Sequence, residues 1–214
     1  MIPILYQDDR LVVCLKPTGI SSEDDGLPAL LSVQLDADKL YCVHRLDKGV
    51  GGVMVYARDR QSAAALSSII ASHGMEKEYL AVIPGTPPED AGELTDLLFH
   101  DRSKNKTYVV KRMRAGVKEA KLSYRLLESQ GPLSLLRVRL HTGRSHQIRV
   151  QFASRKLPLL GDRKYGSTVA CPSLALWACS LSFPHPGTGE RLSFTALPEM
   201  SFPWDQFTML TQEA

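Results

Sequence analysis

Residues 42–53 have the sequence Cys-Val-His-Arg-Leu-Asp-Lys-Gly-Val-Gly-Gly-Val, and this stretch decides how the rest of the chain is interpreted. It places His44, Arg45 and Asp47 within four residues, directly before a glycine-rich turn and an apolar strand predicted over Val53–Ala57. The glycines permit positive φ angles and close approach of another group. A carboxylate beside an arginine stays ionised, so Asp47 is available as a nucleophile, a base or a charge partner. On its own, the stretch is better explained as a surface Asp–Arg pair beside a structural turn.

A second dense stretch, residues 141–151, lies about a hundred residues downstream and has the sequence His-Thr-Gly-Arg-Ser-His-Gln-Ile-Arg-Val-Gln. We expect a helix over roughly Ser145–Ser154, with His146 and Arg149 three residues apart on one face. Arg144 lies near the start of this helix, where unpaired backbone N–H groups favour an anion. Alone, the stretch also describes an amphipathic helix with a solvated basic face.

Composition predicts one globular domain of catalytic size over residues 1–214. The chain has 43% hydrophobic and 23% charged residues, which excludes disordered, fibrous and coiled-coil classes. It has no apolar run of about 18 residues and no secretory pattern at its start, so we expect a cytoplasmic protein that does not bind a membrane. The four cysteines lack metal-type spacing and are expected to be reduced and mostly buried.

Positive charge is concentrated in two segments of an otherwise acidic chain. Residues 102–125 hold nine Lys or Arg and one acid, and residues 137–164 hold eight and one, although the whole chain carries only +3. Such clusters suit a polyanion such as RNA, because each cation near a phosphate releases condensed counterions. Charge alone fits solvated strand faces equally well.

Periodicity predicts an α+β fold, because the chain contains many strands and only two or three helices. A hairpin is expected from Ile4–Tyr6 and Leu11–Leu15, a loop at Pro87–Gly92, and helices at Leu27–Leu35 and Gln61–Ser72. The remaining predicted strands are Tyr79–Ile83, Thr107–Lys111, Leu122–Leu127, Leu133–Leu140, Leu174–Phe183 and Arg191–Thr195.

The two dense stretches together resemble the HRLDxxTSG-like and TGRxHQIRxH-like blocks of the RluA-type RNA pseudouridine synthases. Further matches follow in the family's order along nearly the whole chain: Asp8–Gly19 with its Lys-Pro-x-Gly turn, Glu76–Ala81, Leu160–Gly166 and Phe183–Pro186. The resemblance implies a single domain with a mixed, largely antiparallel sheet, flanking helices and a central active-site cleft.

The resemblance also implies roles for individual residues. Asp47 matches the catalytic aspartate, Tyr79 the tyrosine that packs against uracil and is a candidate base, and Arg149 the residue that pairs with that aspartate. Arg45 matches the arginine that helps displace the target base from the RNA stack. The other expected substrate or RNA contacts are His44, Arg144, His146, Gln147, Ile148 and Leu160.

Two departures from the family pattern stand at Val50-Gly51, where the family has Thr-Ser, and at Gln151, where it has His. Neither removes a group that the chemistry needs, but we expect altered turn geometry or RNA contacts.

The implied reaction is redox-neutral: the N1–C1′ bond of uridine breaks and a C5–C1′ bond forms. No metal and no other cofactor are therefore expected. A carboxylate adduct at C1′, abstraction of the 2′ proton to give a glycal, and attack at uracil C6 all stay open. The expected partner is structured RNA, either rRNA or tRNA, with no obligatory protein partner and a monomer as the default state.

Two other functions compete with this one. A non-catalytic RNA-binding protein with the same fold fits the charge pattern, but has no need of Asp47, Tyr79 and Arg149 together. A carboxylate glycosidase needs a second acid, and Asp162 is better interpreted as a turn residue. His44 and His146 lack a third metal ligand at matching spacing.

Overall fold

The computed structural model describes residues 1–23 and 25–213, with side chains described up to residue 210. The chain is arranged as two compact units. Unit 1 comprises Met1–Lys77 and Trp177–Pro198, and unit 2 comprises Glu78–Leu176 and the chain from Glu199 onward. The single domain expected over residues 1–214 stays a prediction.

Unit 1 is built around strand β4 (Gly51–Ala57), which is buried along its whole length. Its strands follow the order β1-β2-β4-β10, with β11 paired to β10 and β3 paired to β4. β2 runs antiparallel to β4, whereas β10 runs parallel to it, so the sheet is mixed. The other strands are β1 (Ile4–Gln7), β2 (Leu11–Lys16), β3 (Tyr41–Cys42), β10 (Leu176–Pro184) and β11 (Arg191–Thr195).

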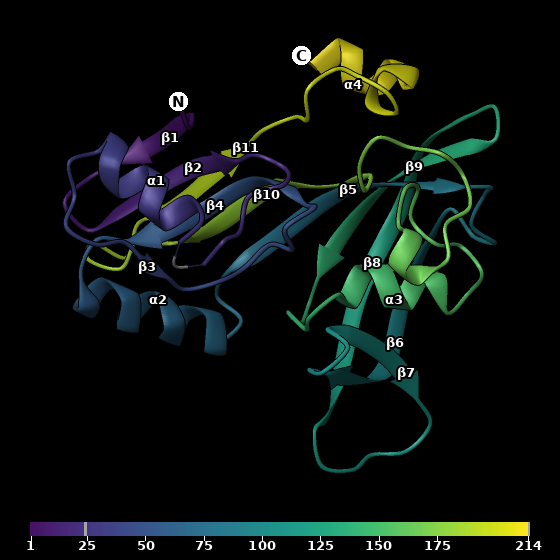
Figure 1. Cartoon of the computed structure of the whole chain (residues 1–214), viewed down its shortest axis with the longest axis horizontal. Coiled ribbons are helices and arrows are strands. Elements are labelled where there is room, and N and C mark those ends of the chain that lie inside the picture. Colours follow the sequence, from purple (N-terminus) through teal and green to yellow (C-terminus); the bar gives the residue numbers. More distant parts are fainter. Residues whose placement is uncertain (24, 214) are drawn as a thin grey trace. The chain divides into compact units, whose positions relative to one another are not determined.

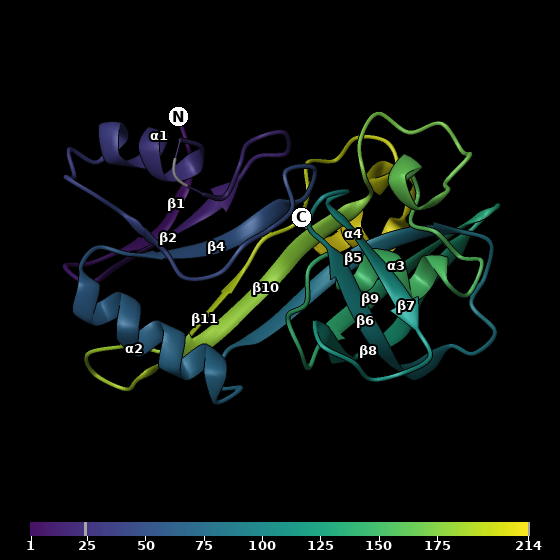
Figure 2. The ribbon, with the colours of Figure 1, turned by 60° about the horizontal axis from the view of Figure 1, so that its bottom comes forward.

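Helices α1 (Leu27–Gln34) and α2 (Arg60–Ala71) lie on opposite sides of β1, β2 and β4 (Figure 2). Helix α2 begins where the Asp59 carboxylate accepts the Ser62 N–H at 2.7 Å, a typical N-cap. Leu66 of α2 packs against the Val53 and Val55 face of β4. Because side chains alternate along a strand, the other face carries Tyr56, whose hydroxyl donates to the Ser22 carbonyl at 2.9 Å.

In unit 2, β6 pairs antiparallel with β7 and β8, β8 pairs antiparallel with β9, and helix α3 lies across these strands (Figure 1). Strand β5 (Glu76–Pro84) enters unit 2 from unit 1, and the strand order there is β5-β9-β8-β6-β7. Helix α3 packs on β6 and β8, with Val150 against Leu98 and Ala120. The other elements are β6 (Ala91–Asp101), β7 (Lys106–Val110), β8 (Val117–Gln130), β9 (Leu133–Leu140), α3 (Gln147–Ala153), the 3₁₀ turns at Arg163–Tyr165 and Trp204–Gln206, and α4 (Thr208–Glu213).

Three sequence predictions need correction. The loop predicted over Pro87–Gly92 is shorter, because Ala91 already pairs with Arg125 of β8. Strands β3 and β6 and helix α4 were not predicted. β3 and α4 are too short to show a period, whereas β6 lacks strict alternation, because its two buried residues, Leu94 and Leu98, lie four residues apart. The helix predicted from Ser145 begins at Gln147, and His146 precedes it with a left-handed φ of 55°.

The predicted α+β class, with a mixed and mostly antiparallel sheet, is confirmed. Within the described part of the chain, no helix is long and apolar enough to cross a membrane. All four cysteines lie in that part and none forms a disulfide. Cys14 and Cys179 are buried as expected, whereas Cys42 and Cys171 are half-buried.

Candidate active site

Asp47 lies in a loop of unit 1 that is held on both sides. On its N-terminal side, Ser22 Oγ donates to the Leu46 carbonyl at 2.7 Å and accepts the Leu46 N–H at 3.1 Å, both in buried positions. On its C-terminal side, the Lys48 carbonyl accepts the Gly19 N–H at 2.8 Å. The Asp47 carbonyl accepts the N–H of Val50 at 2.9 Å. The half-buried Asp47 carboxylate is therefore carried on a fixed backbone.

The buried side chain of Lys16 binds backbone carbonyls next to the Asp47 loop. The Lys16 ammonium donates to the carbonyls of Pro17 and Ile20 at 2.9 and 2.7 Å, and more weakly to that of Lys48 at 3.4 Å. Burial lowers the pKa of Lys16 to about 8, although the nearby charge of Asp47 acts in the opposite direction. The Lys-Pro-x-Gly turn thus supports the Asp47 loop with a positive charge.

His44 and Arg45 point to different environments. His44 is buried, its Nε2 accepts the Val55 N–H at 3.1 Å, and burial together with the Lys77 charge holds its pKa well below the usual range. Its ring is therefore neutral, and Nε2 has no lone pair for a metal. Arg45 is exposed and pairs with Glu23 at 2.9 Å, not with a neighbouring aspartate. Both assignments as RNA contacts stay predictions.

The first departure from the family pattern has a structural counterpart in unit 1. A Cβ atom at Gly51 would overlap the ring of Trp177 on β10, so the indole occupies the space that a serine would need. The Trp177 indole N–H donates to the Ala196 carbonyl at 2.8 Å, which fixes the ring. Val50 is buried. These residues shape the turn after Asp47.

Tyr79 and Arg149 belong to unit 2. Tyr79 is buried on β5. The Arg149 guanidinium is bound side-on by Asp162, with Nε and Nη2 donating to the two carboxylate oxygens at 2.7 and 2.8 Å. Since Asp47 lies in the other unit, the predicted gathering of Asp47, Tyr79 and Arg149 around one nucleobase stays a prediction.

The residues around the start of α3 join it to β8, and their expected RNA contacts stay predictions. Gln147 is buried, its side-chain oxygen accepts the Arg144 N–H at 3.0 Å, and its amide donates to the Lys121 carbonyl at 3.1 Å. Arg144 Nε donates to the Glu119 carbonyl at 2.9 Å. His146 is the residue before α3, and its carbonyl accepts the Val150 N–H at 3.0 Å. His146 and Arg149 both contact Tyr165, in line with the expected shared face.

The remaining predicted residues are buried in unit 2. Ile148 and Leu160 are 4% and 0% exposed. Gln151 is also fully buried, and its amide donates to Asp96 Oδ2 at 2.8 Å and to the Leu94 carbonyl at 3.2 Å. At the second departure from the family pattern, Gln151 therefore joins α3 to β6, and its expected effect on RNA contacts stays a prediction.

The two basic segments differ in what their charges do. In residues 137–164, several cations are engaged inside unit 2: Arg149 with Asp162, Arg155 with Asp96, and Arg137 with Glu78. In the first segment, seven of the nine cations are exposed on the β6–β7 hairpin, the loop that follows and β8: Arg102, Lys104, Lys111, Arg112, Arg114, Lys118 and Arg125. In the second segment, five of the eight cations are exposed: Arg139, Arg155, Lys156, Arg163 and Lys164. The first segment offers the denser exposed positive charge, because Lys111, Arg112 and Arg114 lie within four residues of one another.

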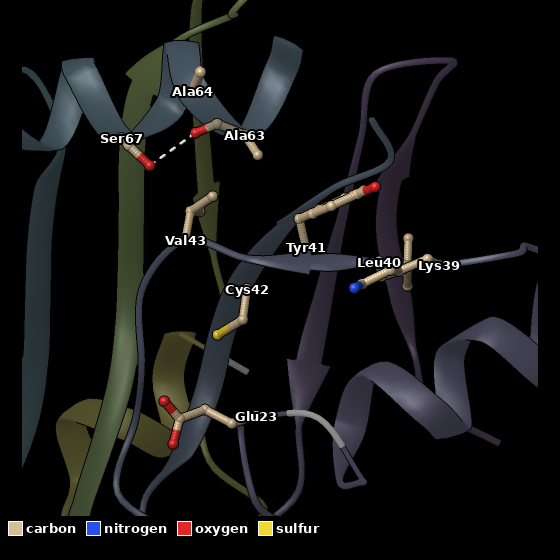
Figure 3. Close-up of a pocket in the computed structure, with 9 residues that line it drawn as sticks. All are labelled: Glu23, Lys39, Leu40, Tyr41, Cys42, Val43, Ala63, Ala64 and Ser67. Atoms are coloured by element: carbon tan, nitrogen blue, oxygen red, sulfur yellow. Dashed lines mark hydrogen bonds between the residues drawn. The ribbon is translucent and has the colours of Figure 1, made fainter. Parts of the chain in front are cut away.

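A cavity of about 400 Å³ lies on unit 1 between α2 and β3 (Figure 3). None of the predicted site residues lines it, although Glu23, the partner of Arg45, does. Its lining is Glu23, Lys39, Leu40, Tyr41, Cys42, Val43, Ala63, Ala64 and Ser67.

Sequence reasoning missed two residues that hold the Asp47 loop. Lys16 belongs to a recognised turn, but its burial under the loop required the structure. Ser22 gave no signal, because a serine in a polar stretch is ordinarily exposed.

Comparisons with known proteins match this chain to RNA pseudouridine synthases. The family model described as RNA pseudouridylate synthase matches residues 10–154. The ribosomal large subunit pseudouridine synthase D of Xanthomonas campestris is 33% identical, over 92% of this chain and 66% of its own length. An uncharacterized RNA pseudouridine synthase of Haemophilus influenzae is 30% identical, over 99% of this chain and 94% of its own length. The structure of human RNA pseudouridylate synthase domain containing 4 superposes with a TM-score of 0.79 at 26% identity, covering 98% of this chain and 93% of that one.

Proposed function

Because this chain belongs to the RNA pseudouridylate synthase family, whose members are isomerases, we propose that it converts a specific uridine of a structured RNA to pseudouridine. Asp47 is the catalytic residue of this proposal. The observation that carries it is the fixed loop between Leu46 and Lys48, which holds a half-buried carboxylate in place. Such pre-organisation is what a reacting carboxylate requires.

The proposed reaction needs only groups that this chain carries. The uridine leaves its stack at a cost of a few kcal/mol, and stacking on Tyr79 offsets about 1–3 kcal/mol of it. The Asp47 carboxylate acts while the N1–C1′ bond breaks and the C5–C1′ bond forms, at C1′, at the 2′ proton or at uracil C6. Arg149 keeps that carboxylate ionised in a poorly solvated site, where an isolated one tends to protonate. Arg45 helps displace the base.

The RNA partner is assigned to the exposed cations of residues 102–118. The chain spans 66% of the length of the Xanthomonas campestris synthase D, so recognition by the whole protein is part of the proposal. That relative is named for the large ribosomal subunit, which makes large-subunit rRNA the first substrate to test and tRNA the second. A monomeric, cytoplasmic enzyme without cofactor completes the proposal.

The decisive experiment is a single-turnover assay on RNA from cells that lack the gene. Asp47→Asn abolishes pseudouridine formation while the Kd for RNA stays within about twofold of wild type. Asp9→Asn, which alters an exposed carboxylate of unit 1, is the matched control and keeps the wild-type rate. Full activity of Asp47→Asn refutes the site assignment. Tight RNA binding by a wild-type protein that modifies no RNA favours the non-catalytic alternative.

The proposed RNA surface has its own test. Replacing Lys111, Arg112 and Arg114 with alanine weakens RNA binding and reduces the slope of log K against log salt, by about 0.7–0.9 for each lost phosphate contact. Lys39→Ala, an exposed cation of unit 1, leaves the slope unchanged. Equal slopes for the triple variant and wild type exclude this surface.

A further inference from the structure

Asp162 fixes the plane of the Arg149 guanidinium. Its two carboxylate oxygens accept hydrogen bonds from Nε and Nη2 at 2.8 Å or less, and the Asp162 and Arg149 side chains are 1% and 11% exposed. This side-on geometry allows only one orientation of the planar fork. A guanidinium has five N–H donors, so two of them are committed to Asp162.

Tyr165 covers a face of the same guanidinium. The Arg149 Cζ atom lies 5.1 Å from the centroid of the Tyr165 ring, within the range of a cation–π contact. The ring is itself held through its hydroxyl, which accepts the Thr107 N–H at 2.8 Å and lies 2.9 Å from His146 Nδ1. Since the hydroxyl accepts from Thr107, its own proton is available to His146 Nδ1.

One short turn supplies both groups. Asp162 precedes the 3₁₀ turn Arg163–Tyr165, and its carbonyl accepts the N–H groups of Tyr165 and Ser167 at 3.1 and 3.0 Å. Residues i and i+3 of a 3₁₀ turn lie on the same side, so Asp162 and Tyr165 face Arg149 together. Gly166 ends the turn with a φ of 94°.

We propose that Asp162 and Tyr165 form a guanidinium clamp, two positioning residues that orient Arg149 for its action on the reacting carboxylate. This proposal rests on the proposed function, because Arg149 acts only there. Neither residue needs to touch the substrate.

Asp162→Asn tests the clamp. It keeps the side-chain volume but loses the charge and one acceptor, so Arg149 is free to turn. We expect the single-turnover rate constant to fall about 10- to 100-fold, as expected for displacement of a reacting group by about 1 Å. The Kd for RNA stays within about twofold. Glu93→Gln is the matched control, because it breaks the exposed Lys121–Glu93 pair of unit 2 and keeps the rate within about twofold.

A double-mutant cycle separates positioning from general stability. In an Arg149→Met background, adding Asp162→Asn lowers the rate no further, because there is no guanidinium to orient. An equal loss in both backgrounds overturns the clamp, as does a loss below about threefold in the wild-type background.

Tyr165 provides a second route if Asp162→Asn does not fold. Tyr165→Phe keeps the ring and loses its anchor, whereas Tyr165→Leu loses both, so the rate falls in the order wild type, Phe, Leu. A wild-type rate for Tyr165→Leu overturns the clamp. If the wild type modifies RNA and the Asp162 and Tyr165 variants do so at the same rate, the clamp alone is refuted. If the wild type modifies no RNA, the proposed function is refuted as well.

Discussion

Removing one buried hydroxyl beneath the Asp47 loop is expected to be costly. In Ser22→Ala, the Leu46 N–H and carbonyl both lose their partner, and both hydrogen bonds are buried. A buried polar group without a partner costs about 1–3 kcal/mol, so two groups together cost about 2–6 kcal/mol of unfolding free energy. The loss of a single oxygen atom adds almost no cavity.

Urea unfolding followed by circular dichroism measures this cost. Ser67→Ala is the matched control, because Ser67 Oγ donates to the Ala63 carbonyl in an exposed position and its removal stays within about 0.5 kcal/mol. The single-turnover rate of Ser22→Ala also falls, by about 10-fold, because the backbone that carries Asp47 gains freedom. Equal stability of Ser22→Ala and Ser67→Ala would show that the loop is held by other contacts.

Three further outcomes are expected. Gly52→Ala lowers the free energy of unfolding, measured in urea, by more than about 4 kcal/mol, because φ is 125° there and a Cβ atom would meet the backbone of Ala178. Gly19→Ala, which has open space around it, lowers it by about 1–2 kcal/mol. Lys77→Met is more stable than wild type at pH 7, because burying the charged ammonium is unfavourable and lowers the pKa of Lys77 to about 8. In the unfolded chain this lysine stays protonated to a higher pH, so the wild type becomes more stable as pH rises above 8. The stability difference between the two proteins therefore shrinks from pH 8 to pH 9. Glu128→Gln increases proteolysis of the C-terminus at pH 7. Burial raises the pKa of Glu128, but the hydrogen bonds from the backbone N–H groups at the start of α4 outweigh it, so the pKa of this carboxyl is lowered overall. Wild type therefore becomes equally sensitive to proteolysis only below about pH 4.5, where the carboxylate of the unfolded chain protonates first.

Each of the three has a clear contrary result. Equal costs for Gly52→Ala and Gly19→Ala would mean that the chain relaxes around β4 and β10. A stability difference for Lys77→Met that is constant from pH 7 to 9 would place the Lys77 ammonium in water. Unchanged proteolysis of Glu128→Gln would show that other contacts hold α4.

Residue patterns within single strands predicted the structure better than the distribution of charge along the chain did. The strands Leu133–Leu140 and Arg191–Thr195 were predicted with the observed bounds, because alternation within a strand is a local signal. The two basic segments looked equivalent by charge, yet three cations of the second segment, Arg137, Arg149 and Arg155, pair with carboxylates of unit 2. Which cation finds a partner depends on the strand pairing that brings distant carboxylates close.

By itself the sequence determined the kinds of element, the order of the motifs and the family, since these depend on residues close together in the chain. Only the tertiary structure decided that Ser22 and Lys16 hold the Asp47 loop, that Trp177 fills the space beside Gly51, and that Asp162 binds Arg149. Those contacts join residues from 13 to 126 positions apart. Periodicity carries no information at such separations, because burial and strand register, not local preference, bring these partners together.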